Sequence, residues 1–339
     1  MRISEPAAFR PAFPVLVGDI GGTNARFGIL AAPDAPLAIL PHVATADHSG
    51  IESAIAASLP PGTTRPRTAI VAVAGPTRLD GIDLTNADWT IRPASMFENS
   101  GLEEIVLLND FEAQALSLTA LGPADLAPIG GGAADPAAAK VVLGPGTGLG
   151  VGALVPAGDR FAPVPGEGGH VSFGPAEPDE MALWPSIEPE HGRISAEAVL
   201  CGRGLLRLYR AVCLHGGVEP RCVSPAEVTA AAAAGDAMAP RTLDFYCRFL
   251  GRLAGDLALI FMARGGVFLA GGIAPRILPF LAKGGFRQAF EAKAPHGTVL
   301  AGNPTSVVIR DGAALLGLAA FAAAPERFGV ALAGRRWRA

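Results

Sequence analysis

Two glycine-rich segments carry the residues best suited to hold a charged ligand. They are Gly18-Asp19-Ile20-Gly21-Gly22-Thr23-Asn24 and Gly144-Pro145-Gly146-Thr147-Gly148-Leu149-Gly150. In such turns the backbone N–H groups can approach phosphate oxygens, because glycine has no Cβ and adopts positive φ. Thr23 and Thr147 each add a hydroxyl donor. One glycine motif is equally typical of a tight hairpin, but the pair indicates phosphate binding.

The first segment also contains Asp19, whose carboxylate suits a hard cation such as Mg²⁺, held through water. Neither segment is a Walker A motif, because the Gly-Lys-Ser/Thr sequence is absent from both. Neither opens directly into a long helix with a downstream acidic residue, so a Rossmann dinucleotide site also fits poorly. We therefore expect the two turns to hold the phosphates of ATP, with Mg²⁺ near Asp19.

A third glycine pair, Gly271-Gly272, follows the apolar run 267–270. A flat ring such as adenine can lie close to a backbone that has no Cβ atoms. A turn between a strand and a helix would use the same glycines. By itself the pair favours this structural explanation.

A carboxylate at the end of an apolar run is the candidate catalytic group. Asn109-Asp110 follows the run 105–108, and open α/β sheets bind ligands at the carboxyl ends of their strands. An alcohol that attacks phosphorus must lose its proton, which an aspartate within hydrogen-bond reach can accept. Asp110 is the predicted base, although aspartate is also a favoured N-cap for the helix that begins at Phe111.

A second group of polar residues could bind a sugar. In Pro165-Gly166-Glu167-Gly168-Gly169-His170, a carboxylate and an imidazole lie on one glycine-rich loop and can hydrogen-bond adjacent sugar hydroxyls. Glu190 and His191 leave a metal site as a lesser alternative. Further along, Ser195 is a typical N-cap residue. Glu197 is either favoured by the helix dipole or takes a sugar hydroxyl.

Strands and helices alternate around these motifs, which is typical of an α/β fold. Apolar runs split by glycine turns predict two β-hairpins, over 13–31 and 141–155, and their similarity indicates a weak internal duplication. The segment 121–139, rich in Pro, Gly and Ala, is expected to be a crossover or hinge. Further strands are predicted at 68–74, 105–108 and 267–270, and helices at 51–59, 111–121, 195–210, 241–262 and 311–324.

Composition excludes several classes of protein. The 339 residues are 50% hydrophobic and 17% charged, which supports two globular domains and argues against disorder. The formal net charge of −4 argues against a nucleic-acid partner, and the basic end 335–338 is interpreted as a solvated tail. Four cysteines without metal-ligand spacing indicate a reducing compartment. We expect no signal peptide and no membrane span, and therefore a cytoplasmic protein.

Taken together, these motifs resemble the bacterial glucokinase family, within the hexokinase, actin and heat-shock chaperone ATPase superfamily. The order and spacing of the motifs agree from about residue 15 to residue 320, which is far more specific than any single motif. The matching segments are GDIGGTNARF (18–27), LLNDFEAQA (107–115), GPGTGLGV (144–151), PGEGGHVSF (165–173), ISAEAVLCGRGL (194–205), GGVFLAGGIAPR (265–276) and DGAALLGLAA (311–320).

The resemblance implies an α/β fold of two ribonuclease-H-like domains, as in actin-like ATPases, with a cleft between them. The smaller domain, 14–120, would hold the first phosphate turn and the catalytic aspartate. The larger domain, 121–330, would hold the second turn, the sugar-binding loop and the adenine site. A leader (1–13) and a tail (331–339) would flank them. The resemblance also implies a homodimer.

The same resemblance assigns roles to the candidate residues, with Asp110 as the catalytic base. The sugar contacts would come from Asn109, Asp110, Glu167, His170 and Glu197. The nucleotide would be bound by Gly18, Asp19, Ile20, Gly21, Gly22, Thr23, Asn24, Gly146, Thr147, Gly148, Gly271 and Gly272. The related ROK kinases carry a cysteine-rich zinc motif beside the sugar-binding histidine. No such cysteines lie near His170, which disfavours that branch.

The resemblance therefore predicts a glucokinase that uses MgATP to phosphorylate the 6-hydroxyl group of glucose, at the entry to glycolysis. A kinase for mannose, fructose or an N-acetylated amino sugar is the main alternative, and polyphosphate is an alternative donor. A non-catalytic sugar sensor of the same fold would have little need of Asp110 together with both phosphate turns. An actin-like or chaperone-like ATPase would not need the loop 165–170.

Overall fold

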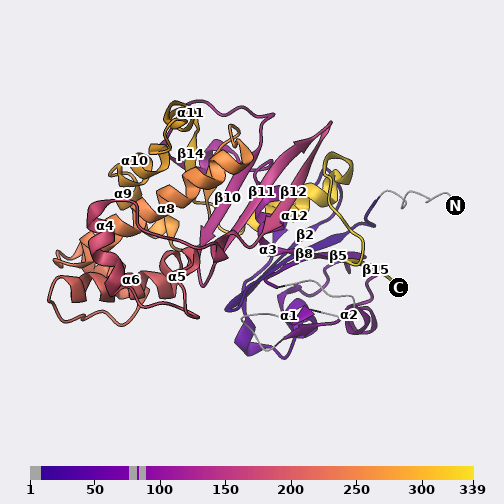
Figure 1. The fold of residues 1–339 in the computed structure, drawn as a ribbon. Coiled ribbons are helices and arrows are strands. Elements are labelled where there is room, and N and C mark those ends of the chain that lie inside the picture. Colours follow the sequence, from indigo (N-terminus) through magenta and orange to yellow (C-terminus); the bar gives the residue numbers. More distant parts are fainter. Residues whose placement is uncertain (1–8, 76–81, 84–88) are drawn as a thin grey trace. The chain divides into compact units, whose positions relative to one another are not determined.

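Strands and helices alternate along the chain, as the sequence predicts, and they divide between two units. The computed structural model describes residues 9–75, 82–83 and 89–339 (Figure 1). Within these ranges, no helix combines the length and the apolar character needed to span a membrane.

Neither unit is one continuous stretch of sequence. Unit 1 consists of the described residues up to Gly122 with 154–165 and 310–339, and unit 2 consists of Pro123–Ala153 and Gly166–Ile309. The first change of unit is close to the predicted boundary at 120. The segment 310–330, which we expected in the larger domain, belongs instead to unit 1. The reason is that its apolar helix packs into the core of that unit.

The sheet of unit 1 has seven strands. They are β1 (Val15–Ile20), β2 (Asn24–Leu30), β3 (Ala38–Ile39), β4 (Val43–Ala44), β5 (Thr68–Val73), β8 (Glu104–Asn109) and β15 (Arg336–Arg338). β1 forms an antiparallel hairpin with β2 and pairs on its other side with β5, which runs parallel to it. β8 follows in parallel, and β15 closes the edge antiparallel to β8. A separate antiparallel pair joins β6 (Ile82–Asp83) to β7 (Thr90–Ile91).

Four helices cover the two faces of this sheet, and β1 divides its side chains between them. The helices are α1 (Ile51–Ser58), α2 (Pro93–Ser100), α3 (Asp110–Ser117) and α12 (Ala313–Ala323). Successive side chains of a strand point to opposite faces. Leu16 and Ile20 therefore pack with α1 and α2, whereas Val15 and Val17 pack with α3 and α12. At Gly317, a Cβ would lie 2.2 Å from a backbone oxygen of α3, so this glycine permits the close helix contact.

The second sheet has six strands in the order β12-β11-β10-β13-β14-β9. They are β9 (Leu126–Gly130), β10 (Lys140–Pro145), β11 (Leu149–Ala157), β12 (Arg160–Gly166), β13 (Val267–Leu269) and β14 (Thr305–Val308). The helices of unit 2 are α4 (Pro178–Leu183), α5 (Ala196–Leu200), α6 (Gly202–His215), α7 (Pro225–Ala233), α8 (Ala239–Phe261), α9 (Leu278–Leu281), α10 (Gly285–Glu291) and α11 (Gly297–Gly302).

The two sheets share one strand order. Strands are counted along the chain from the first strand of the hairpin, leaving out the short β4, which pairs with β2 outside the main order. On this count, each sheet has the spatial order third, second, first, fourth, fifth. Each then ends in an antiparallel edge strand, β15 in the first sheet and β9 in the second. The glycine turns 21–23 and 146–148 join corresponding strands of the two sheets. The weak duplication of the sequence is thus a repeated α/β architecture, in agreement with the expected pair of related domains.

One predicted helix is in fact two. The pattern over 195–210 predicts a single helix, but α5 ends at Leu200 and α6 begins at Gly202. Between them Cys201 has extended backbone (φ −113°, ψ −174°), and its Sγ accepts the Gly204 N–H at 3.3 Å. The apolar pattern continues through the break, so periodicity could not reveal it.

Two segments that we expected to be loose are partly ordered. The predicted hinge 121–139 contains β9, which pairs antiparallel with β14 at the sheet edge. In the predicted leader, residues 1–8 lie outside the described residues, but the Phe9 ring stacks on Phe321 with centroids 5.2 Å apart. The Ala12 N–H donates to the Thr68 hydroxyl at 3.0 Å.

The interpretation of the basic C-terminal end as a solvated tail is wrong. Its arginines bind two carboxylates of unit 1 that are almost completely buried, Glu104 (6% exposed) and Glu112 (1% exposed). Arg335 Nη1 donates to Glu112 Oε2 at 2.6 Å, and Arg336 Nε donates to Glu104 Oε1 at 2.5 Å. A buried carboxylate requires a positive partner and hydrogen bonds to remain ionised. The end of the chain therefore neutralises two charges of the fold.

Replacing Arg335 by Ala should destabilise unit 1 by about 3 kcal/mol, because the Glu112 carboxylate would stay buried without its cation. Urea unfolding followed by circular dichroism measures this loss. Arg338→Ala is the matched control, since its side chain is 62% exposed and its partner Glu104 keeps Arg336. The control should lose at most about 1 kcal/mol. Equal effects of the two substitutions would contradict the role of the Arg335–Glu112 pair.

Candidate active site

The ends of three neighbouring strands place the first glycine turn and Asp110 on one edge of the unit 1 sheet. Ile20 lies opposite Val73 in one parallel pair, and Val73 lies opposite Asn109 in the next. The glycine turn follows Ile20 and Asp110 follows Asn109, so the two features stand two strands apart. A strand spacing of about 4.8 Å makes their separation roughly 10 Å. This carboxyl edge is where α/β sheets bind ligands.

Hydrogen bonds hold the first glycine turn in one shape. The Gly21 N–H donates to the Asn24 carbonyl at 3.0 Å. Thr45, a buried residue that sequence analysis missed, donates its hydroxyl to the Gly21 carbonyl at 3.1 Å and its N–H to the Thr23 carbonyl at 3.0 Å. Thr23 itself is exposed at the tip of the turn. No local motif marks Thr45, because its partners lie far from it in the sequence.

Asp19 lies among charged side chains that suit a nearby divalent cation. It is opposite Arg26 in the hairpin, and Arg26 Nε lies 3.4 Å from Asp311 Oδ1. Burial raises the pKa of the Asp19 carboxyl, Arg26 opposes this rise and Asp311 adds to it. Two carboxylates with one guanidinium leave an excess of negative charge, so these residues fit a cation held through carboxylate and water.

A metal cluster made by protein side chains alone does not occur among the described residues, which contain no suitable group of three or more His, Cys, Asp or Glu. The minor alternative of such a site near His191 therefore lacks support. Mg²⁺ that is bound mainly by phosphate oxygens and water needs only one or two carboxylates. Asp19 is consistent with that kind of site.

A capping box separates the roles of Asn109 and Asp110. The Asn109 Oδ1 accepts the N–H groups of Phe111 at 2.9 Å and Glu112 at 3.3 Å, and Glu112 Oε2 accepts the Asn109 N–H at 3.4 Å. The N-cap role considered for Asp110 therefore belongs to Asn109. Asp110 is the first residue of α3 and is half-buried. Its Oδ1 accepts the Phe111 N–H at 3.0 Å, which orients the carboxylate.

The second glycine turn is tied to the junction of α5 and α6. The Gly146 N–H donates to the Gly148 carbonyl at 2.8 Å, closing the turn. The Gly202 N–H donates to the Gly146 carbonyl at 2.8 Å, and the Leu149 N–H donates to Glu197 Oε2 at 2.7 Å. Thr147 is exposed at the tip, as Thr23 is in the first turn. The backbone of this turn is thus positioned from two sides.

The third glycine pair lies directly beside the second turn. The Ala270 N–H donates to the Leu143 carbonyl at 2.8 Å, which aligns the ends of β13 and β10. Gly271 has φ +77°, and a Cβ there would lie 2.6 Å from the Pro145 carbonyl oxygen. Gly272 is exposed, with no atom within 4 Å of where its Cβ would stand. Close packing explains Gly271, whereas Gly272 presents open backbone beside the second glycine turn.

The predicted sugar loop packs on the strand that follows the second turn. A Cβ on Gly169 would lie 2.0 Å from the Leu149 carbonyl oxygen, and one on Gly168 would meet the Val151 side chain at 2.9 Å. The Glu167 and His170 side chains point into solvent, 88% and 53% exposed, with Oε2 and Nε2 3.8 Å apart. The structure therefore brings this carboxylate and imidazole together next to the turn.

Glu197 reaches the same place from α5. Ser195 caps this helix by accepting the Ala198 N–H on its Oγ at 3.2 Å, as predicted. The Ala196 N–H donates to the Val171 carbonyl at 3.0 Å, which attaches the start of α5 to the end of the sugar loop. The Glu197 side chain is 16% exposed and turns toward the glycine turn.

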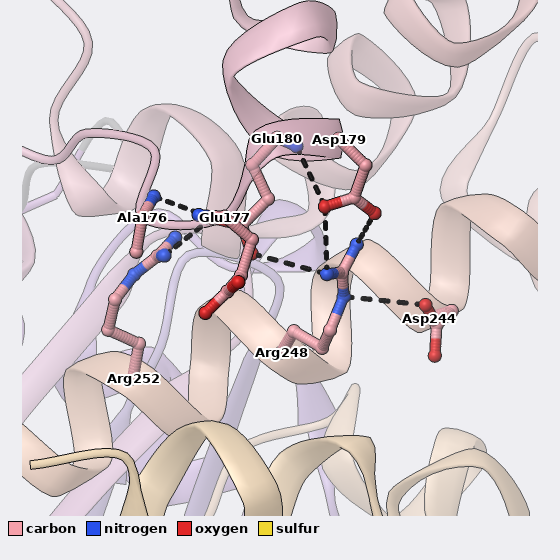
Figure 2. Close-up of polar contacts among 7 residues, drawn as sticks. All are labelled: Ala176, Glu177, Asp179, Glu180, Asp244, Arg248 and Arg252. Atoms are coloured by element: carbon pink, nitrogen blue, oxygen red, sulfur yellow. Dashed lines mark hydrogen bonds and ion pairs between the residues drawn. The ribbon is translucent and has the colours of Figure 1, made fainter.

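A buried carboxylate anchors the segment that follows the sugar loop in the sequence (Figure 2). Glu180 of α4 is 1% exposed and accepts from Arg252 Nη1 of α8 at 2.5 Å. The Arg252 guanidinium also lies over the Phe173 ring, 4.9 Å from its centroid. Arg248 adds two hydrogen bonds to Asp179, at 2.6 and 3.2 Å. These contacts bind the segment 173–180 to the long helix α8.

Comparisons with known proteins agree on one family. The glucokinase family model matches residues 16–325. The chain is 53% identical to the glucokinases of Sinorhizobium fredii (strain NBRC 101917 / NGR234) and Rhizobium meliloti (strain 1021), over 96% of this chain and 97% of each relative. The crystal structure of a glucokinase from an Antarctic psychrotroph is similar, with a TM-score of 0.81 and 32% identity over 91% of this chain and 98% of that chain. The chain therefore belongs to the glucokinase family.

Proposed function

We propose that this chain transfers the γ-phosphoryl group of ATP to the 6-hydroxyl group of D-glucose, giving glucose 6-phosphate and ADP. The observation that carries the proposal is the shared sheet edge of the first glycine turn and Asp110. A phosphate-binding turn and an oriented carboxylate roughly 10 Å apart leave room for a phosphoryl group and its acceptor alcohol between them.

Asp110 acts in this proposal as the general base. Its carboxylate accepts the proton of the sugar hydroxyl while the oxygen attacks the γ-phosphorus and the bond to ADP breaks. The backbone hydrogen bond from Phe111 holds the carboxylate at the start of α3. The cap on α3 uses the Asn109 oxygen, so the Asn109 amide NH₂ is the group that donates to the sugar.

The glycine turns bind the nucleotide phosphates. The N–H groups of Gly21 and Gly146 close their own turns, so the other backbone N–H groups of 21–23 and 146–148, with the exposed Thr23 and Thr147 hydroxyls, donate to phosphate oxygens. When bound through water near Asp19, Mg²⁺ supplies positive charge to the β- and γ-phosphates. Gly271 and Gly272 present the backbone for adenine. Catalysis then rests on positioning and on charge stabilisation.

Glu167, His170 and Glu197 bind the sugar in this proposal, with Asn109 and Asp110. The exposed carboxylate and imidazole of the loop can each take a hydroxyl of the ring. A site that reads hydroxyl groups discriminates strongly, because a sugar that lacks one leaves a polar group unpaired. Coupled ADP assays with glucose, mannose, fructose and N-acetylglucosamine test the choice of glucose. Measuring glucose 6-phosphate formed with polyphosphate in place of ATP tests the donor.

The proposal includes a cytoplasmic homodimer without a nucleic-acid or membrane partner. All four cysteines are free and buried, which suits a reducing compartment. Analytical ultracentrifugation of the purified chain at micromolar concentration tests the dimer, and a single monomer boundary would contradict it.

Asp110→Asn should lower kcat for glucose phosphorylation by roughly 10²- to 10⁴-fold, because the proton acceptor is lost. The asparagine keeps an oxygen that can accept the Phe111 N–H, so the fold and the KM for ATP should change little. Coupled ADP release with and without glucose measures the effect. Asp159→Asn, at a side chain that is 95% exposed, should retain full turnover. Near-normal kcat in Asp110→Asn would rule out this base.

Glu167→Gln should raise the KM for glucose by roughly 10- to 100-fold, because a hydrogen bond to a charged group is replaced by a weaker one. The KM for ATP should stay within about twofold in the same assay. Glu188→Gln, at an exposed glutamate outside the loop, is the control and should leave both values unchanged. A normal glucose KM in Glu167→Gln would remove this residue from the sugar site.

A further inference from the structure

One carboxylate connects the proposed sugar site to the second glycine turn. Glu197 Oε2 accepts the Leu149 N–H at 2.7 Å, at the last bend of the turn. A bond of this length to an ionised acceptor belongs to the stronger class of hydrogen bonds. The Glu197 side chain is only 16% exposed.

The same carboxylate retains capacity for a sugar hydroxyl. An ionised glutamate offers about four lone-pair sites on two oxygens. Oε2 serves the Leu149 N–H, and Oε1 faces Arg203 Nη2 at 3.9 Å, beyond hydrogen-bond distance. The Arg203 side chain is 66% exposed, so its interaction with Glu197 is weak. Glu197 can therefore bind a ligand while it keeps its bond to the turn.

Both ends of this connection are anchored. The start of α5 is attached to the sugar loop through the Ala196–Val171 bond and the isolated bridge between Ser172 and Ser195. The turn is attached to α6 through the bond from the Gly202 N–H to the Gly146 carbonyl. The two elements that Glu197 joins are therefore each held by further backbone contacts.

We propose that Glu197 is a positioning residue that couples sugar binding to nucleotide binding, by holding the second glycine turn through the Leu149 N–H. This inference rests on the proposed function of the two sites. Coupling is reciprocal: if glucose changes the affinity for ADP by some factor, ADP changes the affinity for glucose by the same factor.

Gly148 provides the reciprocal test. A Cβ at this position would lie 2.7 Å from Glu197 Oε2, the flexible end of a side chain. Alanine here should leave the backbone intact and push the Glu197 carboxylate away. A substitution in the phosphate turn is then expected to weaken sugar binding through Glu197.

The first experiment measures ADP binding by calorimetry with Mg²⁺, once without sugar and once with saturating glucose. The ratio of the two ADP affinities measures the coupling and should approach one in Glu197→Ala. The measurement without sugar gives the direct effect of each substitution on the turn. Glu197→Ala should weaken ADP binding about fivefold or more, because the Leu149 N–H loses its acceptor and the turn loosens. Glu197→Gln keeps an oxygen acceptor and should bind ADP within about twofold of the wild type while its glucose affinity falls. Glu167→Gln removes a charge from the sugar loop that does not touch the turn, and should bind ADP normally.

The second experiment measures glucose binding by calorimetry without nucleotide. Gly148→Ala should bind glucose about fivefold more weakly. Gly174→Ala is the matched control, because a Cβ there has no atom within 4 Å and the residue lies just beyond the sugar loop. The control should bind glucose within about twofold of the wild type.

Normal ADP affinity in Glu197→Ala, or normal glucose affinity in Gly148→Ala, would overturn the coupling. If Glu197→Ala fails to fold, Gly148→Ala still decides the question. A wild-type chain that binds ADP but neither binds nor phosphorylates glucose would contradict the proposed function instead. In that case the ADP experiment still tests whether Glu197 holds the turn.

Discussion

Two glycines pack against the backbone at the two ends of the second glycine turn, more closely than a residue with a Cβ atom could. Gly169 packs against the Leu149 carbonyl, and Gly271 packs against the Pro145 carbonyl. Direct hydrogen bonds from Gly202 and to Glu197 complete the enclosure. Three segments contact this turn: the sugar loop, the third glycine pair and the α5–α6 junction. The position of the turn therefore fixes where these segments lie.

In unit 1 the corresponding constraint is strand register. β1, β5 and β8 end at the same level, with Ile20, Val73 and Asn109 aligned across the parallel pairs. A shift by one residue in either pairing would turn Asp110 away from the edge that the glycine turn occupies. Residues 69–73 of β5 are fully buried and pack alternately into the apolar clusters on the two faces of the sheet. The base and the turn are therefore placed by the apolar core.

Buried carboxylates connect distant parts of the sequence in both units. Glu112, which completes the capping box of α3, pairs with Arg335. Glu180, in the segment that follows the sugar loop, pairs with Arg252 (Figure 2). Each ion pair joins a segment near the site to an arginine far along the chain. Such pairs contribute little net stability, yet removing one partner costs much. Here they determine where the end of the chain packs against α3, and where α4 packs against α8.

Local sequence determined the elements whose signals come from neighbouring residues. The glycine turns, the strand before Asp110, the Ser195 cap and the alternation of strands and helices all follow from adjacent residues, and the family resemblance adds roles to them. Tertiary structure decided the partners of Glu197, the support from Thr45, the break at Cys201 and the pairing of β9 and β15. These features depend on groups brought together from distant positions, and the free energy of a buried charge or a close backbone contact exists only once the chain has folded. From sequence alone, the arginines of 335–338 therefore predict a solvated end. Only the fold shows that they pair with the buried carboxylates of Glu104 and Glu112.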